Sequence, residues 1–154
     1  MLARAIFAAA FMAAPSAFAA CGENTIELRQ NGVQAQFAIE LALTPAEQAQ
    51  GLMFRESMPQ FSGMLFINPR PRAVSFWMKN TLISLDILFM DPSGVVQTLQ
   101  HSATPLDTTP IPGGDNIQYI LEINGGVAKL LGFSEGTEAR YIGFDQENAI
   151  WPCE

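Results

Sequence analysis

The sequence is poor in basic residues, cysteine and histidine, and these shortages exclude several classes of protein. Its 154 residues hold eight lysines and arginines against 15 aspartates and glutamates, a formal net charge of -7. Nucleic-acid binding needs a basic patch that neutralises phosphates, and docking on anionic lipid needs a polybasic surface. Two cysteines and one histidine are too few for a Cys/His zinc site. We therefore expect no nucleic-acid partner, no metal and no cofactor.

The first 19 residues have the pattern of a secretory signal peptide. Arg4 supplies the positive charge, residues 5–14 form an uncharged apolar run, and Ala17-Phe18-Ala19 fits a cleavage site. The run is too short for a membrane span, which needs about 20 apolar residues. The pattern predicts an exported protein, periplasmic or secreted, without a transmembrane span. Residues 20–154 would then form one domain.

Cys21 and Cys153 stand near the two ends of this predicted mature chain. An oxidising compartment and an even number of cysteines favour a disulfide between them. The segment Phe18-Ala19-Ala20-Cys21 also partly resembles a lipobox, although Phe18 stands where a small aliphatic residue is usual. We predict a Cys21–Cys153 disulfide, with a membrane-attached lipoprotein anchored at Cys21 as the alternative.

Short apolar runs between turn signals predict a mainly β domain, with a core over about residues 25–145. The expected strands cover residues 25–29, 33–43, 63–67, 73–78, 85–90, 95–100, 117–123 and 137–144. Asn31-Gly32 is typical of a tight hairpin turn. Thr44-Pro45-Ala46-Glu47 is a helix capping box, and a second short helix is expected over residues 127–131. So many short strands with so little helix indicate a β-sandwich or barrel-like fold.

Three other features of the sequence are interpreted without a catalytic role. Residues 101–116, rich in proline and glycine, are expected to form a long loop of the kind that covers binding sites. Gly132–Gly136 matches G-x-S-x-G, but a nucleophile elbow needs a strand before its serine and a histidine after it. The one histidine, His101, precedes the serine. We interpret the motif as a turn and His101 as a solvated or core-edge residue.

Charged residues in apolar surroundings offer the strongest sign of a site. Asp86 lies between Leu85 and Ile87, and Glu122 lies within another apolar run. An unpaired buried charge is costly, so each carboxylate needs a partner. Lys79, which follows Trp77, and Arg55 are the candidate counter-ions. These charges either pair to hold strands in register, or line a cleft below the proline-rich loop.

Five segments of the chain resemble the DUF192 family in sequence and order. They are Gly51–Arg55, Gly63–Phe66, Trp77–Thr81, Leu85–Phe89 and Leu121–Glu122. The resemblance covers residues 27–141 and implies a single, mainly β domain that is sometimes exported. It implies no activity, because the family name itself denotes unknown function. The family's polar signature positions fall on Arg55, Lys79, Asn80, Thr81, Asp86 and Glu122.

Three functional hypotheses follow from these residues. The preferred one is a non-catalytic binding or accessory module of the cell envelope that takes a small polar ligand, such as a glycan or peptide. Its predicted site comprises Trp77, Lys79, Asn80, Thr81, Asp86, Glu122 and Arg55. The second is a protein that binds an envelope partner through exposed apolar loop residues such as Ile111. The third is a hydrolase in which Asp86 and Glu122 divide the roles of acid and base.

Overall fold

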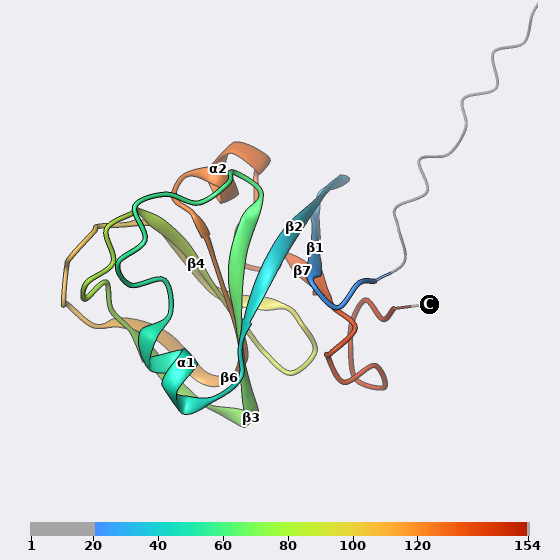
Figure 1. Cartoon of the computed structure of the whole chain (residues 1–154). Helices are drawn as coiled ribbons and strands as arrows, with labels where there is room; N and C mark the ends of the chain where they lie inside the picture. The colour runs from blue at the N-terminus through green and yellow to red at the C-terminus, as the bar shows by residue number, and fades with distance from the viewer. Residues whose placement is uncertain (1–20, 154) are drawn as a thin grey trace, which may run out of the picture.

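One seven-stranded sheet, curled into a half-barrel, organises residues 21–153, which are the residues that this computed structural model describes (Figure 1). Its strand order is β5-β4-β6-β3-β2-β1-β7. The strands are β1 Thr25–Gln30, β2 Val33–Ala42, β3 Ser62–Phe76, β4 Leu85–Met90, β5 Val96–Ala103, β6 Ile111–Asn124 and β7 Glu138–Arg140. The helices are α1 Pro45–Gln50 and α2 Val127–Leu131. This confirms the predicted mainly β, barrel-like domain with two short helices. The predicted signal peptide lies outside the described residues.

The turns predicted from the sequence form as expected. Asn31 and Gly32 have φ values of 50° and 81°, and a type I′ turn requires positive φ at both positions. This turn joins the antiparallel strands β1 and β2. At the start of α1 the Thr44 side chain accepts a hydrogen bond from the Glu47 N–H, and Glu47 Oε2 accepts one from the Thr44 N–H. Because β2 and β3 run parallel, the chain must cross over between them, and α1 lies in that crossover.

The segment 101–116 is mostly strand, which corrects the prediction of a long loop. Strand β5 continues to Ala103, and β6 begins at Ile111. The pairing of β3 with β6 shifts register three times between Ile67 and Ser75. Such bulges allow proline and glycine to occur within a paired strand. The many prolines and glycines of this segment therefore led to the prediction of a loop where a strand forms. Strand β3 likewise runs unbroken through two predicted strands, and β7 is shorter than predicted.

Each face of the sheet buries its own apolar cluster, because neighbouring residues of a strand point to opposite sides. On one face Leu88 and Leu121 pack with residues of α2, such as Ala128. On the other face Phe89 and Ile120 form a second cluster, which includes residues just after α1. We refer to these as the α2 face and the α1 face. The clusters place consecutive residues of β4 and β6 in different environments.

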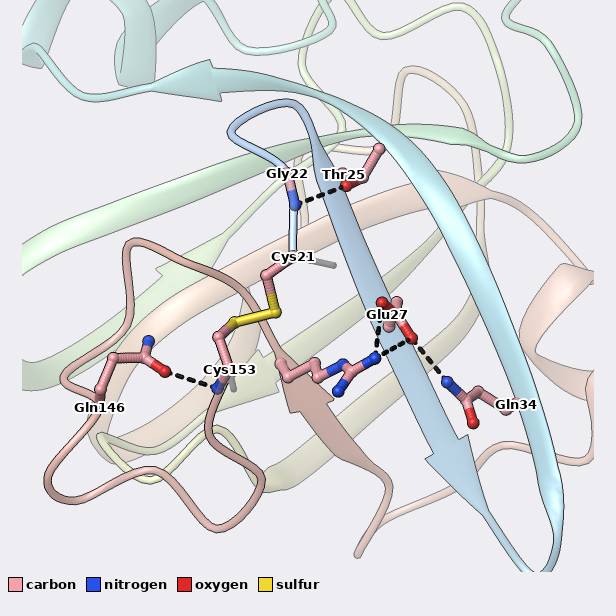
Figure 2. A network of polar contacts seen from close by, with 8 residues as sticks. Cys21, Gly22, Thr25, Glu27, Gln34, Gln146 and Cys153 are labelled. Carbon is pink, nitrogen blue, oxygen red and sulfur yellow. Dashed lines mark hydrogen bonds and ion pairs between the residues drawn. A yellow bond between two sulfur atoms is a disulfide. The ribbon is translucent and has the colours of Figure 1, made fainter. Parts of the chain in front are cut away.

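A disulfide between Cys21 and Cys153 ties the segment before β1 to the end of the described chain (Figure 2). The two residues are 132 positions apart, so the bond closes a loop around the whole domain. Nearby, Glu27 is 2% exposed and accepts hydrogen bonds from Gln34 at 2.6 Å and from Arg140 at 3.1 Å. The structure thus contains the predicted disulfide. A sulfur in that bond is not free for lipid attachment, so the lipid anchor at Cys21 is not compatible with it.

Candidate functional site

A pocket of about 210 Å³ opens on the α1 face, and Glu122 forms part of its wall. Its lining is Gln48, Ala49, Gln50, Gly51, Leu52, Met53, Phe66, Ser75, Phe76, Trp77, Thr81 and Glu122. These residues come from the C-terminal part of α1 and the loop after it, from β3 and the loop after it, and from β6. The pocket therefore lies where the crossover helix meets β3 and β6, near the centre of the strand order.

Glu122 is a buried carboxyl group whose hydrogen-bonding capacity is not met by the described residues. The residue is 5% exposed, and its Oε2 atom is buried without a hydrogen-bond partner. On its two neighbouring strands it pairs with Met64 and Ile87, which both belong to the apolar cluster of the α1 face. Burial in these surroundings raises the pKa of Glu122 to about 8, because the charged form is desolvated. At neutral pH this side chain is therefore mostly a neutral acid.

Aromatic rings and a glycine shape the rest of the pocket wall. The Phe66 and Phe76 rings meet edge to face with their centroids 5.1 Å apart. Gly51 ends α1 with a φ of 50°, and a Cβ atom added there would lie 3.3 Å from the Phe66 ring and 3.9 Å from Glu122 Oε2. Glycine therefore lets the backbone pass close to the carboxyl group. A larger side chain at this position would project toward that oxygen and reduce the space beside it.

Three loops beside the pocket are joined by backbone hydrogen bonds. The Phe54 N–H donates to the Asn80 carbonyl at 2.8 Å, and the Leu106 N–H donates to the Thr81 carbonyl at 3.1 Å. Phe54, Asn80 and Leu106 all have positive φ, between 55° and 66°. Such backbone strain costs about 1–3 kcal/mol per residue and concentrates at functional sites. The side chains of Phe54, Leu106 and Trp77 are exposed in spite of their apolar character.

Five of the seven predicted ligand residues occupy this region. Trp77, Thr81 and Glu122 line the pocket. The Lys79 ammonium lies 5.1 Å from the centre of the Trp77 ring, a cation–π arrangement. The Asn80 amide donates to the Met53 sulfur at 3.9 Å, and its carbonyl holds the Phe54 loop. The Trp77–Thr81 segment thus surrounds part of the pocket.

Asp86 serves a different purpose, and Lys79 is not its partner. It is fully buried, and its Oδ1 accepts from the N–H groups of Ser102 at 2.7 Å and Gly126 at 3.0 Å. Its Oδ2 accepts from the Ala128 N–H at 2.8 Å. The carboxylate thereby fixes the start of α2 and the irregular end of β5. The expected Lys79–Asp86 pair is wrong. Backbone N–H groups, and not a lysine, provide the hydrogen bonds that the buried carboxylate of Asp86 requires.

The hydrolase hypothesis fails on the register of the sheet. Asp86 pairs with Ile123 across β4 and β6, whereas Glu122 pairs with Ile87. Since paired residues share a face, Asp86 points to the α2 face and Glu122 to the α1 face. Two carboxyl groups on opposite sides of a sheet cannot act on one bond. The proposed acid–base pair is therefore excluded.

Arg55 and Ile111 also depart from their predicted roles. Arg55 forms a forked ion pair with Glu40, one branch of which joins Nη2 to Oε2 at 2.6 Å. The hydrogen bond from Arg55 lowers the pKa of Glu40. Arg55 is therefore committed to Glu40 and is not the counter-ion of Glu122. Ile111 begins strand β6 and packs, partly buried, against the apolar cluster of the α1 face. It is not an exposed loop residue.

Fold and site together define a small β domain with a pocket of about 210 Å³ beside a buried carboxyl group. The family profile of DUF192, described as Uncharacterized ACR, matches residues 26–141. The chain belongs to the DUF192 family. No curated protein matches the sequence. Within residues 21–153 no helix is long and apolar enough to cross a membrane.

Among the solved structures similar to the chain are two proteins with 38% and 34% sequence identity. One is a protein of unknown function from Novosphingobium aromaticivorans, with 38% sequence identity and a TM-score of 0.74. The match covers 76% of this chain and 84% of that protein. The other is a putative transcription regulator from Sinorhizobium meliloti, with 34% identity and a TM-score of 0.74. There the match covers 80% of this chain and 96% of that protein. Both structures share the fold of this chain. Neither description states an established activity that could be assigned to it.

Proposed function

We propose that the protein is a non-catalytic binding module of the cell envelope that holds a small polar ligand in the Glu122 pocket. One observation carries this proposal: a buried carboxyl oxygen without a hydrogen-bond partner borders an open cavity. A buried polar atom left unsatisfied costs about 1–3 kcal/mol. A ligand that bonds to Glu122 removes that cost, so the site is suited to binding.

The surroundings of Glu122 support the same function. Ligand pockets are mostly apolar and aromatic, with a few polar groups that set orientation. Here Phe66, Phe76 and Trp77 supply the apolar walls, while Glu122 and Thr81 supply polar atoms. The cavity of about 210 Å³ is below the range of about 300–1,000 Å³ that is typical of sites for drug-sized ligands, so it suits a fragment of a molecule and not an oligosaccharide. The predicted signal peptide and the Cys21–Cys153 disulfide support a location in the envelope.

Two features favour binding over other functions. None of the other residues that line the pocket carries an ionisable side chain, so Glu122 has no second group with which to share acid–base catalysis. The Sinorhizobium meliloti structure is described as a putative transcription regulator, and the net charge of -7 argues against direct nucleic-acid binding by this chain.

A fragment screen by NMR on the oxidised chain tests the proposal. We expect hits that shift the Gly51 amide and the Trp77 indole signals, because both residues line the pocket. Trp77→Ala should weaken these hits at least tenfold while the fold is retained. Leu130→Ala is the matched control, because Leu130 is an exposed apolar residue on α2, at the other face. Hits that map elsewhere, or unchanged binding by Trp77→Ala, would refute the proposal.

A further inference from the structure

The Glu122 pocket offers hydrogen-bond acceptors and aromatic rings, and no basic side chain is among its lining residues. Residues 48–50, which line it, belong to the last turn of α1, where the Glu47 and Gln50 carbonyls accept hydrogen bonds from the Gly51 and Met53 N–H groups. Those carbonyls form the negative end of the helix dipole, which favours a cation. Glu122 Oε2 adds an unpartnered acceptor, and the ring faces of aromatic side chains attract cations. We infer that the ligand is a small primary ammonium compound whose charged nitrogen binds Glu122. This inference rests on the proposed function of the same pocket.

The charged groups around the pocket leave Glu122 without a cation of the protein's own. Of the ion pairs formed among residues 21–153, none includes Glu122. Arg55 on the loop after α1 is paired with Glu40 on β2, and Glu47 on α1 bonds to the backbone at the start of that helix. Lys79 lies over the Trp77 ring, and on β4 the carboxylate of Asp86 points to the opposite face. A cationic ligand would therefore be the counter-ion of Glu122.

Binding of an ammonium group should release a proton. Burial holds the pKa of Glu122 at about 8, so at pH 7 its carboxyl group is mostly neutral. The ammonium nitrogen keeps its own proton, because amines of this class titrate at about pH 10. The O–H bond of Glu122 then breaks, its proton passes to the buffer, and an ammonium–carboxylate pair remains. Each pH unit below about 8 should weaken binding about tenfold, because a proton competes with the ligand.

The test compares benzylamine with benzyl alcohol, which has nearly the same shape and no charge. Calorimetry of the oxidised full domain at pH 7, in phosphate and in Tris, should show nearly one proton released per benzylamine bound and none for benzyl alcohol. Benzylamine should bind at least tenfold more tightly than the alcohol, and its affinity should rise between pH 6 and pH 8. Equal affinities, or benzylamine binding without proton release, would overturn the ammonium inference.

Two variants separate this inference from the proposed function. Glu122→Gln should have an affinity for benzylamine at least tenfold lower than that of the wild type. Its affinity for benzyl alcohol should be unchanged, because glutamine resembles the neutral acid. Lys79→Gln should bind benzylamine more tightly, because a like charge beside Trp77 is removed. If the alcohol binds and the amine has no advantage, the pocket binds ligands but not cations. If neither compound binds and the fragment screen finds no hit in the pocket, the proposed function fails as well.

Discussion

The two faces of the sheet treat a buried carboxyl group in opposite ways. Asp86 and Glu122 lie on adjacent strands, one residue out of register, and both are almost completely buried. On the α2 face, three backbone N–H groups surround Asp86. On the α1 face, Glu122 has an unpartnered oxygen and an open pocket beside it. A buried carboxyl group thus stabilises the structure on one face, and on the other it is the group to which we assign ligand binding.

The difference also appears in how each face is completed. On the α2 face the helix packs directly on the sheet, and Val127 and Ala128 belong to the core. On the α1 face helix α1 has no buried residue, and the space beneath its C-terminal end is the pocket. A closed face can satisfy a carboxylate with its own backbone. In the proposed function, the incompletely covered face leaves that task to a ligand.

The largest effect should come from Asp86→Ala. The change leaves three buried N–H groups without an acceptor, and each costs about 1–3 kcal/mol. We expect a loss of about 3–9 kcal/mol in the free energy of unfolding, or a failure to fold, measured by guanidinium denaturation. Asp86→Asn keeps one acceptor oxygen and should lose less. A loss below about 1 kcal/mol would show that Asp86 is not structural and would break the comparison of the two faces.

Removal of the disulfide with Cys21→Ser and Cys153→Ser should have the next largest effect. A bond across 132 positions is worth about 4–5 kcal/mol in the chain-entropy model. The loss should lie in global stability, while the NMR signals of Gly51 in the pocket stay unchanged, because the bond lies at the far edge of the sheet. The intact mass of the exported wild-type protein provides the control, and it should show two hydrogens lost and no acyl chain. An added diacylglycerol would contradict the disulfide.

Glu122→Gln should stabilise the protein, but only at higher pH. The pKa of Glu122 is raised by folding from an ordinary value of 4.5 to about 8, so the folded state binds the proton more tightly than the unfolded state. The contribution of Glu122 to the free energy of unfolding is therefore fully present below about pH 4.5. It is lost as the pH rises toward 8. We expect the variant to gain about 4 kcal/mol at pH 8 and little at pH 4.5, since each of the roughly three and a half pKa units between the unfolded and folded states is worth about 1.36 kcal/mol. Equal stabilisation at both pH values would show that Glu122 is not buried as a neutral acid.

Sequence patterns predicted the strands that alternate clearly and the turns that have special residues, such as Asn31-Gly32. They failed where bulges let Pro112 and Gly113 enter a strand, because composition does not reveal ladder irregularity. They identified Trp77 and Glu122 from the residues themselves, and Thr81 through the resemblance to the DUF192 family. They did not identify Gly51, Phe66 or Phe76, because an ordinary helix cap and core phenylalanines have no distinctive signal. They predicted the wrong partner, Lys79, for Asp86. The types of side chain in a sequence do not show where backbone N–H groups will act as donors.

The smallest effect should come from Arg55→Ala, which tests whether Arg55 belongs to the pocket. Its partner Glu40 has a side chain that is 57% exposed, and solvent and salt weaken such a pair to about 0.2–1 kcal/mol. Because Arg55 lowers the pKa of Glu40, the pair's contribution is present above pH 4.5 and fades as the carboxylate is protonated at lower pH. Glu40→Ala and the double variant complete a thermodynamic cycle that measures this coupling. Fragment binding at Trp77 should be unchanged in all three variants. A large loss of binding in Arg55→Ala would place this arginine in the ligand site, and the Glu122 pocket would then have a cation of its own.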